Sequence, residues 1–290
     1  MREVRLARIT DVHIHIQPWR ELKPQVLEVM WRDRPDERER MIQLMDDPQV
    51  LLEAMDRAGV WRAGLVNYPS PDVMGFSEAT NDFAARYAQA DPERLLPYGG
   101  VHPRFTRDAS AGVDRLVDLG IRLVKIHPPH QGFPANAYTD GLEALGTIYR
   151  RCEARGLPVM VHTGTSIFPG ARSKYGNPME LDDVAIDFPD LRIVMAHGGR
   201  PLYMAEAFFI LRRHRNVWLD VSGIPPARLL EYFPRLPELA DRVLWGTDWP
   251  SPGVKDMKRN IDQFHALPLS DAHRTAILET NALALFPVAH

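Results

Sequence analysis

A single cysteine, Cys152, occurs in 290 residues, which excludes an intramolecular disulfide and is typical of a reducing compartment. No apolar run approaches the roughly 18 residues of a transmembrane helix, and the N-terminal segment lacks the apolar stretch of a secretory signal. The net charge is only −3 with both signs interspersed, so nothing favours nucleic acid or an anionic membrane surface. These absences predict a soluble cytoplasmic protein.

Two common signatures of enzyme chemistry are also missing. The sequence has no G-x-S-x-G segment, so the serine nucleophile of an α/β-hydrolase is not expected. Neither a dinucleotide-binding fingerprint nor a phosphate-binding glycine motif is present. Any chemistry therefore has to come from other side chains.

Eight short apolar segments recur along the chain, and each ends in a polar residue or a Gly/Pro turn. They are predicted strands that end at residue 15 and span residues 61–67, 95–102, 121–127, 158–163, 191–197, 217–221 and 242–247. Helical patterns lie between and after them, at 49–58, 81–90, 109–119, 141–155, 181–187, 204–213, 226–232, 254–264 and 271–285. This alternation predicts an α/β fold, a (β/α)8 TIM barrel. No Gly-rich linker interrupts residues 1–290, so we expect one domain.

An extra segment, about 18–48, separates the first two predicted strands. It is rich in charge and contains Trp19 and Trp31. One interpretation is a solvated helix. The other is a cover over the barrel mouth, because a loop that follows a strand emerges on the catalytic face of such a barrel.

Polar residues gather where the predicted strands end, which is where a TIM barrel places its active site. They are His13, His15, Tyr68, His102, Lys125, His127, His162, His197, Ser222 and Asp248. Six of the 11 histidines are in this set, whereas His130 falls in a loop and the other four on helices or the tail. Because side chains alternate along a strand, His13 and His15 are expected to point the same way.

Several imidazoles and a carboxylate are the ligands that a divalent transition metal such as zinc prefers. Such an ion binds neutral imidazoles, and it lowers the pKa of a coordinated water towards roughly 7. The strand ends therefore predict a metal site at the mouth of the barrel.

Four motifs in this order resemble the amidohydrolase superfamily. They are His13-x-His15, Val-Met-Val-His162-Thr-Gly, Ala-His197-Gly-Gly and Gly-Thr-Asp248-Trp-Pro. The sequence is most similar to the amidohydrolase-related branch, which includes aminocarboxymuconate-semialdehyde decarboxylase-like enzymes. The similarity extends from about residue 9 to the segment Asn-Ala-Leu-Ala-Leu-Phe that ends at residue 286.

The resemblance implies roles for the matching residues. His13, His15, His162 and Asp248 would hold one divalent metal, zinc or alternatively manganese, and Asp248 would also accept a proton from water. His197 would be either a ligand of a second metal or a polarising group near the substrate.

Lys125 has three possible roles at this stage. It could be carbamylated and bridge two metals, it could neutralise a substrate anion, or it could be structural, and burial would lower its pKa in each case. Further candidates for substrate contact are Tyr68, His102, His127, Arg200 and Trp249.

Three functions are compatible with the resemblance. The first is a hydrolase of an ester, lactone or amide of a small carboxylate-bearing substrate. The second is a non-oxidative decarboxylase on the same scaffold, and the third is a catalytically inactive barrel that binds a small molecule. The resemblance also makes a homo-oligomer plausible.

Overall fold

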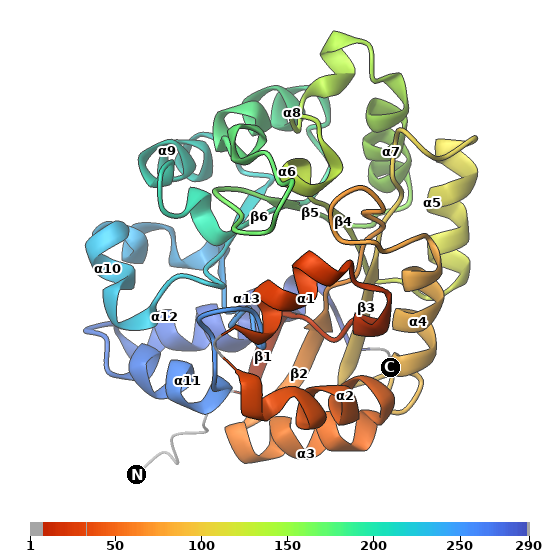
Figure 1. Cartoon of the computed structure of the whole chain (residues 1–290). Coiled ribbons are helices and arrows are strands. Elements are labelled where there is room, and N and C mark those ends of the chain that lie inside the picture. The colour runs from red at the N-terminus through yellow and green to blue at the C-terminus, as the bar shows by residue number, and fades with distance from the viewer. Residues whose placement is uncertain (1–7, 33, 289–290) are drawn as a thin grey trace.

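The computed structural model describes residues 8–32 and 34–288. Its centre is a parallel sheet of eight strands in the order β1 to β8, surrounded by helices (Figure 1). The strands are β1 Ile9–Ile14, β2 Val60–Leu65, β3 Leu95–Gly99, β4 Leu123–Ile126, β5 Val159–His162, β6 Ile193–Ala196, β7 Val217–Asp220 and β8 Val243–Leu244. The predicted (β/α)8 barrel is confirmed, and all eight strands lie where the apolar segments placed them.

Backbone hydrogen bonds connect the first strand to the last. Val12 N donates to Trp245 O at 2.9 Å, Asp248 N donates to His13 O at 2.8 Å, and His15 N donates to Trp249 O at 2.7 Å. These bonds continue past the short β8 and place residues 245–249 beside residues 12–15. The barrel is therefore nearly closed, and the two ligand motifs at its seam lie side by side.

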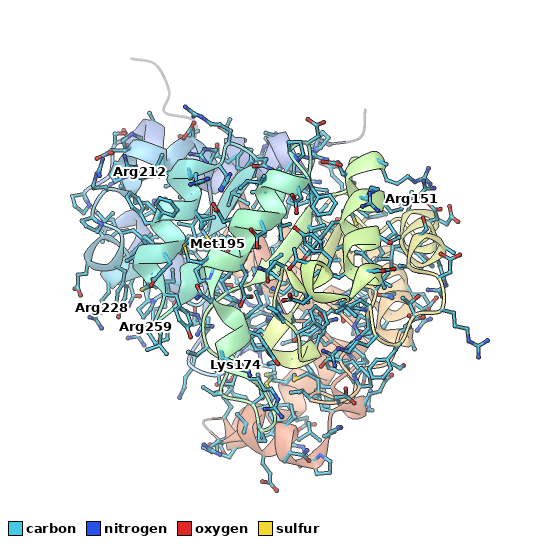
Figure 2. The ribbon with its side chains drawn as sticks, turned by 90° about the horizontal axis from the view of Figure 1, so that it is seen from above. Arg151, Lys174, Met195, Arg212, Arg228 and Arg259 are labelled. Atoms are coloured by element: carbon cyan, nitrogen blue, oxygen red, sulfur yellow. The ribbon has the colours of Figure 1, made fainter. Side chains whose placement is uncertain are left out.

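Most helices cover the outside of the barrel and match the predicted pattern, whereas α1, α2 and α6 lie in segments where the pattern placed no helix. They are α1 Pro24–Trp31, α2 Arg38–Asp46, α3 Pro48–Ala58, α4 Ala79–Ala88, α5 Ala109–Asp118, α6 Pro128–Gln131, α7 Glu143–Ala154, α8 Leu181–Asp187, α9 Met204–Arg213, α10 Leu229–Tyr232, α11 Met257–His265, α12 Asp271–Thr275 and α13 Asn281–Leu285. Charged residues such as Arg151 and Arg212 lie on their outer faces, whereas Met195 of β6 is covered by them (Figure 2). None of the helices in the described ranges is long and apolar enough to cross a lipid bilayer.

A compact apolar cluster fills the interior of the barrel. It includes Val12, Leu96, Leu123, Met160 and Val194, all completely buried. Burying each such side chain stabilises the fold by roughly 1.5–3 kcal/mol. Because the strands are covered on both faces, nearly all of their residues are apolar. This is why the strands could be predicted from the sequence.

The extra segment folds as α1 and α2 with short 3-10 turns, so it is not a single solvated helix. Figure 1 shows α1 in front of the strands, and Leu22 and Met30 line a cavity together with His15. The buried side chain of Arg34 donates from Nη2 to the carbonyl oxygens of Ser251, at 3.1 Å, and Val254. These contacts support the prediction that the segment covers the mouth, which stays a prediction.

Candidate metal centre and active site

The first pair of histidines lies on an irregular part of β1. The pairing of β1 with β2 shifts register between Asp11 and Ile14, and His13 N donates to Asp11 Oδ1 at 3.1 Å. Irregularities of this kind re-aim side chains beside active sites. As a result the Nε2 atoms of His13 and His15 lie 3.2 Å apart, both on the same side as predicted.

Asp248 joins this pair. Its Oδ1 lies 3.0 Å from His15 Nε2 and 3.6 Å from His13 Nε2, and the three side chains can offer ligand atoms within 4.8 Å of one another. Two imidazoles and a carboxylate are a typical protein ligand set for a catalytic zinc ion, which keeps a further position open. The chain thus brings three of the four predicted ligands together.

The chemistry of His13 fits a metal ligand. Its Nδ1 lies 2.6 Å from Asp220 Oδ2, and both oxygens of Asp220 already accept from Ser222, so this carboxyl group is placed to accept a proton of Nδ1 and to leave the lone pair on Nε2. Burial lowers the pKa of His13 well below its ordinary value, so the ring is neutral at pH 7. A neutral imidazole held by a carboxylate on its other nitrogen is the usual arrangement of a metal-binding histidine.

Arg200 holds the outer oxygen of Asp248. Its Nη2 donates to Oδ2 at 3.0 Å. Burial alone would raise the pKa of Asp248, but the hydrogen bond from His15 and the charge of Arg200 act in the opposite direction, and the pKa lies well below its ordinary range. Asp248 is therefore ionised at neutral pH and is a weak base.

His197 and Asp248 share an unusual backbone conformation. Both have φ of 68°, in the left-handed region that few residues other than glycine adopt. Strain of this kind persists where the surrounding structure fixes it, and it occurs preferentially at functional sites. His197 directly follows β6, Asp248 lies four residues after the end of β8, and both line the cavity described next.

A cavity of about 140 Å³ opens at the carboxyl ends of the strands. Seven of the predicted site residues line it, namely His15, Tyr68, His127, His162, His197, Arg200 and Asp248. Two other predicted residues, His102 and Trp249, are not among the described residues that line this cavity. His102 packs against Phe105 and Phe133, and Trp249 lines a different cavity beside α3. Side-chain direction past a strand end depends on the turn, which alternation along the strand does not predict.

His162 lies outside the group of three but close to it. Its ring centroid is 4.7 Å from that of His197, and its Nε2 is buried without a hydrogen-bond partner. Burial lowers the pKa of His162 well below its ordinary value, so the ring is neutral at neutral pH and one of its two nitrogens carries a lone pair. Its role as the fourth ligand stays a prediction that this orphaned atom supports.

Three imidazoles stack along one wall of the cavity. The ring of His127 lies 3.8 Å from that of His162 and 3.5 Å from that of His130. His130 hydrogen bonds through Nδ1 to Tyr68 Oη at 2.8 Å and through Nε2 to Ser166 Oγ at 2.7 Å. The sequence pattern left His130 out because it lies in a loop, and the short helix α6 carries it into the wall.

Lys125 is completely buried on β4, and its Nζ has no hydrogen-bond partner among the described residues. Burial lowers its pKa to about 8, an effect that the charges of Asp220 and Asp248 oppose. Lys125 therefore carries much of the positive charge near the two carboxylates, which fits any of its three expected roles.

Asp11 is a site residue that the sequence pattern missed. It is completely buried and accepts hydrogen bonds from His13 N, from Thr247 N at 3.0 Å and from Thr247 Oγ1 at 2.6 Å. Asp11 lies two residues before His13 and Thr247 directly precedes Asp248, so this carboxyl group connects the two ligand motifs. The sequence feature that could have identified Asp11 is its position two residues before His13.

Replacing Asp11 with alanine should lower the free energy of unfolding by about 2 kcal/mol or more, because it leaves buried donors without an acceptor. Urea denaturation measures this loss. Asp11→Asn keeps one acceptor oxygen and should cost less. A free energy of unfolding for Asp11→Ala within about 0.5 kcal/mol of the unchanged protein would contradict this role.

The sequence pattern of the Amidohydrolase family matches residues 10–288, nearly the whole chain. The chain belongs to the amidohydrolase family. The resemblance inferred from the four motifs is thereby confirmed. Over 123 residues the chain is 33% identical to a 2-pyrone-4,6-dicarboxylate hydrolase of Comamonas testosteroni, an alignment that covers 30% of this chain and 40% of that protein.

Two further amidohydrolase relatives align over most of this chain. A γ-resorcylate decarboxylase of a Rhizobium species is 25% identical over 84% of this chain and 88% of its own length. A solved TIM-barrel protein from Bordetella bronchiseptica superposes with a TM-score of 0.72 at 26% identity, covering 96% of this chain and 97% of that one. The named relatives include a hydrolase and a decarboxylase, both acting on small carboxylates according to their names.

Proposed function

We propose that this amidohydrolase is a metal-dependent hydrolase that cleaves an ester, lactone or amide of a small carboxylate-bearing substrate. The observation that carries the proposal is the convergence of His13 Nε2, His15 Nε2 and Asp248 Oδ1, with His13 Nδ1 already bound by Asp220. His162 would add a fourth ligand from β5. A bound zinc ion would act as a Lewis acid on water and on a substrate oxygen.

Arg200 is the candidate group for the substrate carboxylate. It lines the cavity, and its Nε is buried without a partner while Nη2 holds Asp248. A planar guanidinium binds carboxylates through two parallel hydrogen bonds. The stacked faces of His127 and His162 beside it favour a flat substrate.

His197 presents a lone pair, and not an N–H group, on its Nε2 atom. Its Nδ1 lies 2.9 Å from Ser222 O, which can only accept, so Nδ1 carries the proton and Nε2 has the lone pair. Burial and the nearby charge of Arg200 lower the pKa of His197 well below its ordinary value. Of the two expected roles, this geometry favours the metal ligand over a group that polarises the substrate by donating a hydrogen bond.

Decarboxylation is the second candidate, and one observation favours it. Because Arg200 holds the outer oxygen of Asp248 and the pKa of Asp248 is low, this carboxylate is poorly placed to take a proton from water. A decarboxylase does not need that step, since no water attacks the scissile bond.

The alternative for the cofactor is a second metal ion, bridged to the first by a carbamylated Lys125. The metal content would then be two ions per chain instead of one.

A substrate screen in water labelled with oxygen-18 tests the proposal. Lactones, esters and amides of aromatic and muconate-type acids are incubated with the zinc-loaded protein, and acid release, carbon dioxide release and oxygen-18 in the product are measured. We expect one labelled oxygen per turnover and no carbon dioxide. Protein stripped with a chelator is the control, and activity should return with zinc. Carbon dioxide release without label uptake would establish the decarboxylase instead.

A further inference from the structure

Asp220 and Ser222 form a buried hydrogen-bonded unit at the end of β7. Ser222 N donates to Asp220 Oδ1 at 2.8 Å, and Ser222 Oγ donates to Asp220 Oδ2, also at 2.8 Å. Both side chains are completely buried. The unit therefore has a fixed geometry, independent of solvent.

This unit contacts a histidine on each side. Asp220 Oδ2 lies 2.6 Å from His13 Nδ1, and Ser222 Oγ lies 3.0 Å from His197 Nδ1. Because the Ser222 hydroxyl proton is directed to Asp220, its oxygen is left to accept from His197, as the Ser222 carbonyl oxygen also does at 2.9 Å. Asp220 Oδ2, Ser222 Oγ and the Ser222 carbonyl oxygen thus each face an Nδ1 atom.

The surrounding backbone leaves space for the carboxylate. A side chain at Gly246 on the neighbouring chain segment would place its Cβ 2.6 Å from Asp220 Oδ1 and 2.9 Å from both His13 Cβ and Ser222 Cβ. Such distances are shorter than van der Waals contact, so only glycine permits the three residues to meet. Burial raises the pKa of Asp220 to about 7, whereas the hydrogen bonds from Ser222 and the positive charge of Lys125 from β4 act in the opposite direction.

We propose that Asp220 and Ser222 are positioning residues that fix the proton on Nδ1 of both His13 and His197. The Nε2 lone pairs of the two histidines then face the metal centre and the cavity together. The inference rests on the proposed function in so far as His13 is a metal ligand. It adds that one buried unit on β7 sets the orientation of rings from β1 and from the end of β6.

Asp220→Asn should disturb this arrangement whichever way the amide is turned. With the amide nitrogen towards His13 it donates to Nδ1 and moves the ring proton to Nε2, which blocks the ligand lone pair. With the amide nitrogen towards Ser222, the amide N–H group faces the backbone N–H of Ser222, and neither group can accept a hydrogen bond from the other. Loss of a carboxylate that orients a metal-binding histidine typically costs roughly 10–100-fold in metal affinity.

The chain offers a matched control. His214 Nε2 lies 2.6 Å from Asp182 Oδ1, a histidine–carboxylate pair of the same length outside the barrel. Asp182→Asn should leave zinc affinity unchanged. Ser222→Ala should keep the Asp220–His13 contact and most of the zinc affinity, but weaken the hold on His197.

The test combines zinc titration against a chromophoric chelator with nitrogen-15 spectra of histidine-labelled, metal-free full-length protein. We expect both His13 and His197 to be protonated on Nδ1 in the unchanged protein. Asp220→Asn should raise the zinc Kd by roughly 10–100-fold. Ser222→Ala removes the Oγ acceptor but keeps the Ser222 carbonyl oxygen, so the nitrogen-15 signals of His197 should shift while the proton stays on Nδ1.

Two results would overturn the inference: an unchanged zinc Kd in Asp220→Asn, or an Nε2-bound proton on either histidine in the unchanged protein. If Asp220→Asn fails to fold, the His197 signals of Ser222→Ala decide, and unchanged signals count against the unit. If the unchanged protein binds no zinc, the proposed function fails, while the tautomers of the metal-free protein still decide this inference.

Discussion

Asp248→Asn should lower kcat by about 100-fold or more on any substrate found by the screen, the usual scale for loss of a group that ligates or transfers a proton. The carboxylate contributes Oδ1 to the metal centre and Oδ2 to Arg200. An amide presents only one oxygen, so one of these contacts is lost and the negative charge with it. Steady-state kinetics with metal content measured on the same sample gives the result.

Asp256→Asn is the control for Asp248. Asp256 is exposed in the same part of the chain, and its carboxylate only accepts from Arg259 N at the start of α11. That variant should keep kcat. If the Asp248→Asn protein retained both its metal and a near-normal kcat, Asp248 would have no part in the reaction.

His13→Ala should lose most of the bound metal and leave the barrel folded. The substitution removes the ligand nitrogen that Asp220 orients, and a catalytic zinc site has few protein ligands to spare. Elemental analysis of the purified protein should fall from one zinc per chain to a small fraction. Two metals per chain in the unchanged protein would instead support the bridging role of Lys125.

His265→Ala controls for the loss of an imidazole, because His265 is exposed at the end of α11. It should retain one metal per chain. Circular dichroism separates loss of metal from loss of fold in His13→Ala. Full metal occupancy in a folded His13→Ala protein would show that the ligand assignment is wrong.

The fold was predictable from the sequence because each strand is buried on both faces and each helix on one. Those two patterns have different periods, so eight apolar runs and the helices between them could be separated without any contact information. The site was predictable where function depends on residue type at a strand end, as for His13, His15 and Asp248. These three converge because the carboxyl ends of the parallel strands meet at one rim.

The missed residues act through hydrogen bonds that the sequence does not display. Asp11 and Asp220 each join segments more than 200 residues apart, Asp11 to Thr247 and Asp220 to His13. His130 reaches the cavity only because α6 turns the chain back after β4. Trp249 was expected at the pocket but lines another cavity, since the turn after β8 decides its direction.

The seam between β1 and β8 has a consequence for how the protein is made. Asp248 N donates to His13 O, so the metal centre is built from segments near opposite ends of the chain. A nascent chain on the ribosome cannot complete the centre until Asp248 has emerged, and long-range pairing of this kind is slow to form. Metal uptake would thus wait for the eighth strand, since a truncated chain that ends before β8 has His13 and His15 but lacks the carboxylate that completes the site.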